Sequence, residues 1–546
     1  SFTVFPFINY SSINFRVSNV KGFLAPSAKK FVIFLSNRLL FSRFVLYYLK
    51  YNPARGRLND RRMIMNERNL TLLTDFYELT MMQGYFKEEN ANETVVFDAF
   101  YRNNPDGNGY AVCAGLEQVI EYLENLHFDQ KDVDYLRSTG MFQEDFLDYL
   151  LHFRFSGDVY AIPEGTVVFP REPLVKVVAP IMEAQLVETA LLNIINHQSL
   201  IATKAARVVY AAAGDGVMEF GLRRAQGPDA GIYGARAAMI AGCIGTSNVL
   251  AGQMFDVPVK GTHAHSWIMS FPDELTAFRT YAHLYPDACI LLVDTYDTLK
   301  SGIPNAIKVF TEMREAGIPL SFYGIRLDSG DLAYLSKQAK KMLDAAGFSD
   351  AVISASNDLD EHLIASLKLQ GAAINSWGVG TNLITSKDSP SFGGVYKLAA
   401  IMDRETGKFI PKIKLSENAE KITNPGNKTI QRIYEKDTGK IIADLICLAD
   451  ETYSNKNSLL LFDPIETWKK TLLAPGTYTL PVFQKGKCVY HSPKVMEIRD
   501  YCQRELDTLW EESRRLVNPH EVHVDLSNEL WHMKKQLLDS YHFSGC

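Results

Sequence analysis

The second half of the chain repeats one unit at regular spacing, and this repetition constrains the fold more than any other feature. From Gly214 onward, short apolar runs end in polar residues and are followed by amphipathic stretches. The ends of successive runs lie roughly 24 to 40 residues apart, a spacing typical of βα units on a parallel sheet. The runs occupy residues 215–227, 255–266, 289–297, 321–331, 351–360 and 372–382. We therefore expect an α/β barrel. A doubly wound open sheet is the alternative, although no GxGxxG follows any of these strands.

The sequence on both sides of these units follows other patterns. Residues 69–88 and 114–128 have helical periodicity, and Thr74 is a candidate cap for the first helix. Residues 93–102 resemble a strand, and the alternation in 155–180 predicts antiparallel strands. Further strand-like runs and a final pair of helices follow Ala400. We predict an N-terminal segment at 65–195, the barrel at 196–405 and a C-terminal accessory segment at 406–546.

Residues 1–64 differ in composition from the rest of the chain. Residues 1–59 contain no Asp or Glu but nine Lys or Arg. Their longest apolar stretch is interrupted by Asn37, Arg38 and Arg43, and it falls short of the ~20 continuous apolar residues of a membrane span. A transit peptide is one interpretation. We favour another, in which Arg61-Arg62-Met63 is encoded as a ribosome-binding site and the working protein starts at Met65 or Met63.

Charge and cysteine usage restrict the class of partner and compartment. A net charge of −6 gives no general attraction to nucleic acid or to a membrane surface. The seven cysteines are scattered and form no CxxC pair, which is typical of free thiols in a reducing compartment. We expect a cytoplasmic protein that binds small molecules.

Polar residues gather at the predicted strand ends, where the active site of an α/β barrel lies. Their types suit the binding of charged and hydroxylated ligands. They are Arg223, Arg224, Thr262, His263, His265, Asp294, Arg326, Asp328, Asp331, Ser356, Asn357, Gly378, Gly380 and Thr381.

Two of these residues, His263 and His265, are spaced so that they would share one face of a strand. A zinc site would need further histidines on later strands, but His283 and His362 fall in helix-like stretches. The remaining alternatives are a catalytic pair, a single nucleophile, or two ordinary histidines.

Two glycine clusters are candidates for phosphate binding. "GVGT" (378–381) and "SFGG" (391–394) allow backbone N–H groups to approach phosphate oxygens, and Thr381 adds a hydroxyl. Arg223 and Arg224 can add charge-assisted hydrogen bonds. The alternative is that these glycines are only turn residues.

The segment "GIRLDSGDL" (324–332) places a cation between carboxylates. Arg326 can form a forked pair with a ligand carboxylate. Asp328 and Asp331 can hold the hydroxyls of a sugar, or Mg²⁺ through water. The alternative is an ion pair between Arg326 and Asp328.

Taken in order, several of these segments resemble nicotinate phosphoribosyltransferases. The similarity runs from about Asn69 to beyond Lys397 and excludes residues 1–64. It is carried by "TDFYELTM", "EFGLRRAQGPD", "SNVLAG", "GTHAHS", "LLVDTYD", "GIRLDSGDL", "ISASNDLDE", "GVGT" and "SFGGVYKL". The resemblance implies an irregular α/β barrel of the type II phosphoribosyltransferases, with an α/β sandwich domain built from the flanking segments. It also implies a homodimer whose active sites take residues from both subunits.

The implied reaction joins nicotinate to 5-phosphoribosyl 1-pyrophosphate (PRPP), releases pyrophosphate, is coupled to ATP hydrolysis and uses Mg²⁺. By resemblance, Tyr77 stacks on the pyridine ring, and Thr262 and Arg326 hold nicotinate. His265 is the histidine phosphorylated from ATP, and we place Asp328 with it in the catalytic set. The predicted PRPP contacts are Arg223, Gly380, Thr381, Gly393 and Gly394, whereas the protein ligands of Mg²⁺ are not identified.

Three alternatives to this interpretation remain. The chain could use nicotinamide or quinolinate in place of nicotinate, or it could be an inactive barrel homologue. The presence of Tyr77, Thr262, His265, Arg326 and Thr381 argues against the inactive homologue, because loss of function usually removes such residues.

Overall fold

The computed structural model describes residues 69–88, 91–418, 421–435, 437–453, 459–461, 470–472, 475–477 and 479–543. The interpretation of residues 1–64 as a leader lies outside the described residues. Residues 69–546 form one compact unit. None of the described helices is long and apolar enough to cross a membrane.

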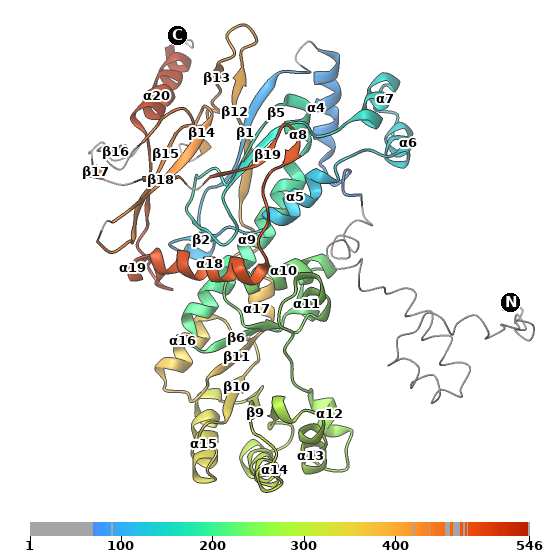
Figure 1. The fold of residues 1–546 in the computed structure, drawn as a ribbon, viewed down its shortest axis with the longest axis vertical. Helices are drawn as coiled ribbons and strands as arrows, with labels where there is room; N and C mark the ends of the chain where they lie inside the picture. Colours follow the sequence, from blue (N-terminus) through green and yellow to red (C-terminus); the bar gives the residue numbers. More distant parts are fainter. Residues whose placement is uncertain are drawn as a thin grey trace, which may run out of the picture. The chain divides into compact units, whose positions relative to one another are not determined.

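A parallel sheet of six strands forms the barrel part of this unit (Figure 1). All of its ladders are parallel, and their order is β7-β6-β11-β10-β9-β8. The strands are β6 (Gly216–Glu219), β7 (Gly245–Thr246), β8 (Cys289–Leu292), β9 (Tyr323–Leu327), β10 (Val352–Ala355) and β11 (Ser376–Val379). Each is short and almost entirely buried, as expected for parallel strands covered by helices.

Helices between these strands cover the sheet and bury its apolar side chains. They begin soon after each strand ends, several of them at an Asp or Asn cap such as Asn248, Asp331 and Asp360. The helices are α10 (Pro228–Ile240), α11 (Val249–Phe255), α12 (His265–Met269), α13 (Glu274–Leu284), α14 (Ile303–Glu315), α15 (Leu332–Ala345), α16 (Glu361–Leu369) and α17 (Thr381–Ile384).

One predicted strand of the barrel is wrong. Residues 255–266 contain no ladder, and only Val259 forms an isolated parallel bridge, to Thr246. Strand β7 was hidden in an Ala- and Gly-rich stretch that has helical character on both sides. Strands of this length carry too little periodicity to be recognised. The parallel sheet is therefore a curled half-barrel that Val259 extends, which makes the barrel irregular.

The flanking segments build an antiparallel sheet of seven strands, in the order β13-β12-β1-β5-β3-β19-β20. This sheet joins strands from distant parts of the sequence. They are β1 (Thr94–Tyr101), β3 (Asp158–Ala161), β5 (Val175–Pro180), β12 (Gly394–Met402), β13 (Phe409–Pro411), β19 (Leu480–Gln484) and β20 (Lys487–Cys488). The predicted strand at 93–102 and the antiparallel strands in 155–180 are thereby confirmed.

Helices from the N-terminal segment pack on this sheet. The predicted helices at 69–88 and 114–128 are confirmed, but Asp75 occupies the cap position of the first, and the Thr74 hydroxyl donates to Glu78 instead. The helices are α4 (Phe76–Lys87), α5 (Leu116–Glu124), α6 (Gln130–Ser138), α7 (Glu144–His152), α8 (Ile181–Leu186) and α9 (Glu188–Ala211). Helix α9 contacts both β12 and the barrel helices α10 and α16, so it connects the two sheets.

The C-terminal segment adds a four-stranded sheet and the predicted pair of long helices. The strand order is β18-β14-β15-β21. The elements are β14 (Lys428–Tyr434), β15 (Ile441–Leu448), β18 (Pro475–Thr477), β21 (His523–Leu526), α18 (Val495–Thr508), α19 (Glu511–Arg514) and α20 (Asn528–Phe543). Two small ladders complete the described structure: β2 (Ala111–Val112) with β4 (Val167–Val168), and β16 (Leu459–Leu461) with β17 (Lys470–Leu472).

Buried ion pairs tie the segments together. Arg236 on α10 is completely buried and donates to Glu164 and Glu117 of the N-terminal segment, each at 2.7 Å. Arg432 on β14 is also buried and donates to Asp444 at 2.7 Å and to Glu505 on α18 at 3.1 Å. A buried guanidinium needs such partners, because an unpaired charge in the interior costs several kcal/mol.

Candidate active site

The carboxyl ends of β8, β9 and β10 bring several predicted site residues to one edge of the sheet. Leu292 pairs with Arg326 across β8 and β9, and Arg326 pairs with Ser354 across β9 and β10. Asp294, Asp328 and Ser356 follow within two residues of these positions. Because the strands are parallel, residues that follow them lie close together.

Arg326 is held by three neighbouring side chains, and its Nη1 also donates to the His263 carbonyl at 3.5 Å. Its Nε donates to the Ser356 hydroxyl at 2.8 Å, and its Nη1 donates to the Thr262 hydroxyl at 2.8 Å. Its Nη2 donates to Asp328 Oδ1 at 2.9 Å, and the side chain is 16% exposed. An Arg has five N–H groups, and the second Nη2 N–H has no acceptor among the described residues. The guanidinium is therefore fixed in position but retains a donor for a ligand.

Asp328 forms the ion pair with Arg326 that the sequence left as an alternative. Its backbone N–H donates to Asp294 Oδ2 at 2.7 Å, and the hydroxyl of Ser356 donates to its side chain. Burial alone would raise the pKa of Asp328, but the Ser356 hydrogen bond and the charge of Arg326 lower it. Asp328 is therefore a stable anion at neutral pH.

His265 lies beside this ion pair. Its Nδ1 is 3.0 Å from the Thr295 hydroxyl, its Nε2 is 3.7 Å from Asp328 Oδ2, and its side chain is 39% exposed. Thr295 follows Asp294 directly, and the sequence did not predict its role, because that role depends on the position of His265 at the start of α12. The ring is thus oriented by two oxygen atoms while one side remains open to a ligand.

His263 and His265 do not share one face, contrary to the expectation for a strand. Helix α12 begins at His265, with Ala264 as its cap residue, so the chain turns between the two rings. His263 is buried, its Nε2 accepts from the Leu292 N–H at 3.3 Å, and its ring lies edge-on to Tyr281. Burial lowers its pKa to about 4. His263 is therefore a neutral structural residue. The two histidines that a zinc site would have required, His283 and His362, lie in α13 and α16.

The ends of β6 and β11 form a second polar region. The Phe220 N–H donates to the Val379 carbonyl at 2.8 Å. A Cβ on Gly380 would lie 3.2 Å from the Phe220 carbonyl oxygen, so glycine permits this close approach. The Thr381 hydroxyl makes no hydrogen bond to a described residue, and Arg223 is exposed in the short helical turn Leu222–Arg224. Free N–H, hydroxyl and guanidinium donors are the groups that bind phosphate.

A buried carboxylate, that of Glu219, lies in this region. Glu219 ends β6, is fully buried, and accepts from the Thr246 hydroxyl at 2.6 Å. Burial raises its pKa. The sequence analysis did not select Glu219, although a carboxylate at the end of an apolar strand was the available signal.

The second glycine cluster, which was predicted to bind phosphate, does not lie at the strand ends of the barrel. Gly394 begins β12 in the seven-stranded sheet, and a Cβ there would collide with Asn196 of α9. Gly393 precedes it with a positive φ of 69°. Packing and turn formation therefore account for this second glycine pair.

Tyr77 lies on α4, which packs against α8 on the seven-stranded sheet, away from the strand ends of the barrel (Figure 1). It is 46% exposed, and its hydroxyl is hydrogen-bonded to Glu188. Burial of the hydroxyl and the nearby acids Glu188, Glu78 and Asp75 raise its pKa. Within one chain, the structure does not bring Tyr77 to Arg326.

Comparison with known proteins places these motifs in one family. A model of the nicotinate phosphoribosyltransferase (NAPRTase) family matches residues 216–433. Models of the N-terminal and C-terminal domains of nicotinate phosphoribosyltransferase match residues 72–196 and 427–534.

Individual relatives agree with the family models. The chain is 48% identical over 472 residues to the nicotinate phosphoribosyltransferase of Bacillus subtilis, covering 86% of this chain and 95% of that protein. It is 33% identical over 520 residues to the human nicotinate phosphoribosyltransferase, covering 84% and 95%. The crystal structure of human nicotinic acid phosphoribosyltransferase superposes with a TM-score of 0.73 at 30% identity, over 85% of this chain and all of that one.

The environment of His263 predicts a loss of stability in acid. Its folded-state pKa of about 4 lies below the ordinary value of 6.5, so the unfolded chain binds a proton that the folded chain does not. The contribution of His263 therefore falls as the pH is lowered through 6.5 towards 4, by about 2 kcal/mol between pH 7 and pH 5.

Denaturant unfolding of the wild type and of His263→Phe at both pH values measures this contribution. The stability difference between the two proteins should shrink by that amount at pH 5, because Phe takes up no proton. A pH-independent difference would show that His263 is not buried in its neutral form.

Proposed function

The chain belongs to the nicotinate phosphoribosyltransferase family, the enzymes of NAD salvage that form nicotinate mononucleotide and pyrophosphate from nicotinate and PRPP, and from this premise we propose how its residues divide the work. The observation that carries the proposal is the restrained guanidinium of Arg326, which has a free donor beside His265. Nicotinate, the phosphates of PRPP and the phosphorylation site are assigned around it.

Nicotinate binds through its carboxylate to Arg326 and Thr262. The spare Nη2 N–H is available as a donor on this side of the guanidinium, and the Thr262 hydroxyl, which donates to the His263 carbonyl at 3.4 Å, can turn towards the ligand. Charge-assisted hydrogen bonds of this kind are about twice as strong as neutral ones. Nicotinamide carries no negative charge to offset the desolvation of Arg326, so the site favours nicotinate.

The transfer step needs positioning and charge stabilisation but no general base. The ring nitrogen of nicotinate attacks C1 of the ribose with its lone pair, while the bond from C1 to pyrophosphate breaks and both electrons leave with the pyrophosphate. Gly380 and Thr381 at the end of β11, together with Arg223, hold the phosphates and stabilise the leaving group.

His265 accepts a phosphoryl group from ATP. The imidazole attacks the γ-phosphorus, an N–P bond forms, the bond to ADP breaks, and water later hydrolyses the phosphohistidine to release phosphate. Thr295 and Asp328 supply the contacts that hold the imidazole in position for this attack. The same Asp328 also orients Arg326, which connects the phosphorylated residue with the nicotinate site.

Mg²⁺ enters with the polyphosphate substrates. Asp294 is a suitable protein contact because its Oδ1 is buried and has no hydrogen-bond partner among the described residues. Its Oδ2 is already used by Asp328 and Ser329. Asp331 caps α15 and is less available. The ion would neutralise negative charge on the pyrophosphate.

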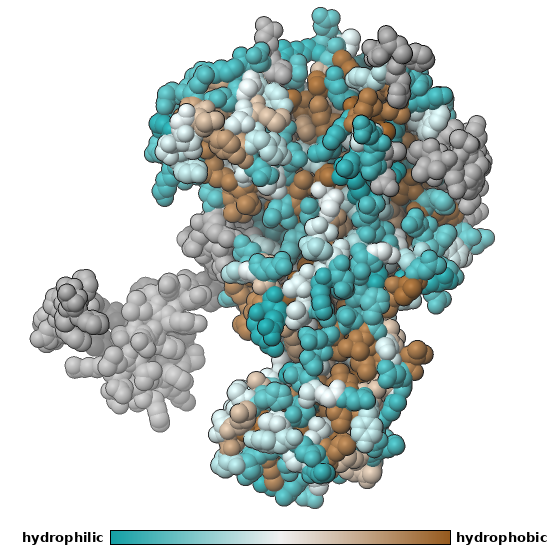
Figure 2. All heavy atoms as spheres, turned by 180° about the vertical axis from the view of Figure 1, so that it is seen from behind, coloured by the Kyte–Doolittle hydropathy of each residue, from teal (hydrophilic) through white to brown (hydrophobic). Residues whose placement is uncertain are grey.

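A homodimer completes each site with Tyr77 of the second copy. Helix α4 and the residues before it expose the apolar side chains of Leu73, Phe76, Tyr77 and Met81. Residues that follow the barrel strands expose Val249, Val259, Met269 and Tyr296. On the face drawn in Figure 2, apolar side chains form patches over both the barrel and the seven-stranded sheet. Association through such surfaces removes them from water and can bring the Tyr77 ring to the pyridine ring.

Replacement of Arg326 tests the nicotinate site. Arg326→Ala should raise the KM for nicotinate roughly 30-fold, the equivalent of about 2 kcal/mol for a lost charge-assisted pair, and leave the KM for PRPP nearly unchanged. Arg279→Ala, which breaks an exposed ion pair with Glu312, is the matched control. Steady-state kinetics with nicotinate and nicotinamide should show that Arg326→Ala also reduces the preference for nicotinate. An unchanged KM for nicotinate would remove Arg326 from this role.

Replacement of His265 tests the coupling to ATP. His265→Ala should incorporate no phosphate from γ-labelled ATP and should lose stimulation by ATP, while a slow transfer without ATP remains. His283→Ala, on the exposed side of α13, should behave like the wild type. Labelled phosphate retained on the His265→Ala protein would show that another residue is phosphorylated.

Heterodimers test whether Tyr77 acts across subunits. Assayed at a nicotinate concentration well below KM, Tyr77→Ala and Arg326→Ala should each be nearly inactive. A heterodimer of the two variants, co-expressed and purified through two different tags, should recover about half of the wild-type activity, because one of its two sites contains both native residues. If Tyr77 serves its own chain, the heterodimer stays inactive, and if no heterodimer can be isolated, the dimer itself is excluded.

A further inference from the structure

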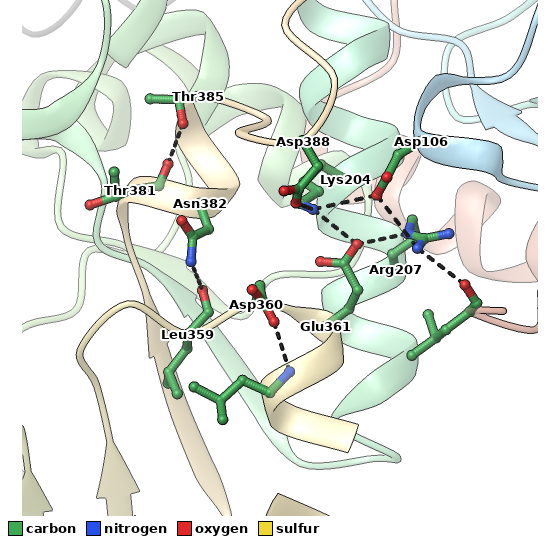
Figure 3. Close-up of polar contacts among 12 residues, drawn as sticks. Asp106, Lys204, Arg207, Leu359, Asp360, Glu361, Thr381, Asn382, Thr385 and Asp388 are labelled. Atoms are coloured by element: carbon green, nitrogen blue, oxygen red, sulfur yellow. Dashed lines mark hydrogen bonds and ion pairs between the residues drawn. The ribbon is translucent and has the colours of Figure 1, made fainter. Parts of the chain in front are cut away.

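A buried ion network joins helix α9 to the start of α16 (Figure 3). Lys204 and Arg207 of α9 donate to the same oxygen of Glu361, at 2.9 Å and 2.8 Å. These three side chains are at most 3% exposed. Lys204 also donates to Asp388 at 2.9 Å, and Asp106 lies 3.7 Å from Lys204 and 3.5 Å from Arg207.

This buried ion network (Asp106, Lys204, Arg207, Glu361 and Asp388) does not have the charge balance of a cation site. Asp106, Glu361 and His362 have ligand atoms within 4.8 Å of one another, a spacing compatible with a bound metal ion. The ammonium of Lys204 and the guanidinium of Arg207 already pair with Glu361 at hydrogen-bond distance and lie within 4 Å of Asp106. A divalent cation would have to displace them, so a different role is needed.

Asp388 connects the network to the segment that we assign to the phosphates of PRPP. It lies in the turn that follows α17, and Lys204 is its only ion-pair partner among the described residues. The turn folds back on α17: the Thr385 hydroxyl donates to the Thr381 carbonyl at 2.7 Å, and the Lys387 N–H donates to the Asn382 carbonyl at 3.3 Å. The position of Asp388 is therefore transmitted to residues 381–385.

Asn382 provides a second connection. Its side chain is buried, and its Nδ2 donates to the carbonyls of Asp358 and Leu359, at 2.8 Å and 3.2 Å, in the loop after β10. Helix α17 has only four residues, Thr381–Ile384. A helix this short has no stability of its own, because nucleation costs more than its few hydrogen bonds return. Its shape must come from such contacts.

We propose that Lys204, Asp388 and Asn382 are positioning residues for PRPP, holding residues 380–385 in the conformation that binds its phosphates. This inference rests on the proposed contacts of PRPP with Gly380 and Thr381. A segment that is already ordered loses less conformational entropy when the ligand binds, so weakening its connections should raise the KM for PRPP. The nicotinate contacts, on β9 and before α12, lie outside this segment.

The test compares two aspartates that are equally exposed. Asp388→Ala removes the connection to Lys204, whereas Asp344→Ala removes an ion pair with Lys340 on the surface of α15, and both native side chains are 44% exposed. Asp388→Ala should raise the KM for PRPP roughly fivefold or more and leave the KM for nicotinate unchanged. Asp344→Ala should change neither constant. Equal KM values for PRPP in the two variants would overturn the proposal.

Two further measurements separate this inference from the placement of PRPP. Hydrogen exchange of the intact protein should be faster at residues 381–388 in Asp388→Ala, and unchanged exchange there would also overturn the proposal. Thr381→Ala should raise the KM for PRPP by itself. If Thr381→Ala raises the KM for PRPP and Asp388→Ala does not, the positioning role is wrong. If Thr381→Ala leaves the KM for PRPP unchanged, the assignment of PRPP to Thr381 is wrong, whatever the result for Asp388→Ala.

Discussion

Parallel pairing of β8, β9 and β10 is the constraint on which the site depends. Parallel strands end at the same edge of a sheet, so three segments separated by about 30 residues each can contribute one polar group to a common point. Arg326 stands at the centre of this edge and is restrained by Thr262, Ser356 and Asp328. A register shift of one residue would turn Arg326 towards the opposite face, because successive side chains of a strand alternate.

Arg326 also determines how the surrounding charges behave. Its guanidinium keeps Asp328 ionised in a half-buried position. Asp328 in turn lies next to His265, and its backbone N–H donates to Asp294 Oδ2. The nicotinate carboxylate, a phosphorylated imidazole and a metal-bound pyrophosphate would all be neighbours of this one ion pair. In the proposed assignment, a change in charge at His265 would therefore alter the electrostatic environment of Arg326 through Asp328, which lies within 4 Å of both side chains.

Several parts of the fold and site could be predicted from the sequence because they are local. Arg326, Asp328 and Ser356 follow apolar runs whose length and spacing define parallel strands. The sequence did not predict that helix α12 begins at His265, so it placed both histidines on one strand face. The position of the His263 ring depends on its contact with Leu292, which is 29 residues away in the sequence. Thr295 was missed for the same reason, since its role exists only once α12 brings His265 to it.

The parts that could not be predicted are those joined by buried charges from distant segments. Lys204 and Arg207 interrupt an apolar stretch of α9, which is a signal that they have buried partners, but Glu361 lies 157 residues from Lys204 in the sequence. Buried ion pairs contribute little net stability compared with apolar packing, yet they tolerate few alternative geometries. In this chain they fix the positions at which the segments meet. The arginines and lysine involved are Arg236 on α10, Lys204 on α9 and Arg432 on the C-terminal sheet.

In the proposed assignment, one chain does not contain the whole site, because Tyr77 lies away from Arg326. The barrel provides polar groups for a carboxylate and for phosphates, but its strand ends offer no aromatic side chain beside Arg326 among the residues that contact it. Helix α4, which packs on the seven-stranded sheet, carries the exposed side chain of Tyr77, which is hydrogen-bonded to Glu188 and makes no ring contact with a described residue. These two incomplete surfaces are complementary in chemistry. Pairing of two copies would therefore assemble a stacking surface with an anion-binding pocket, and it would make catalysis depend on association.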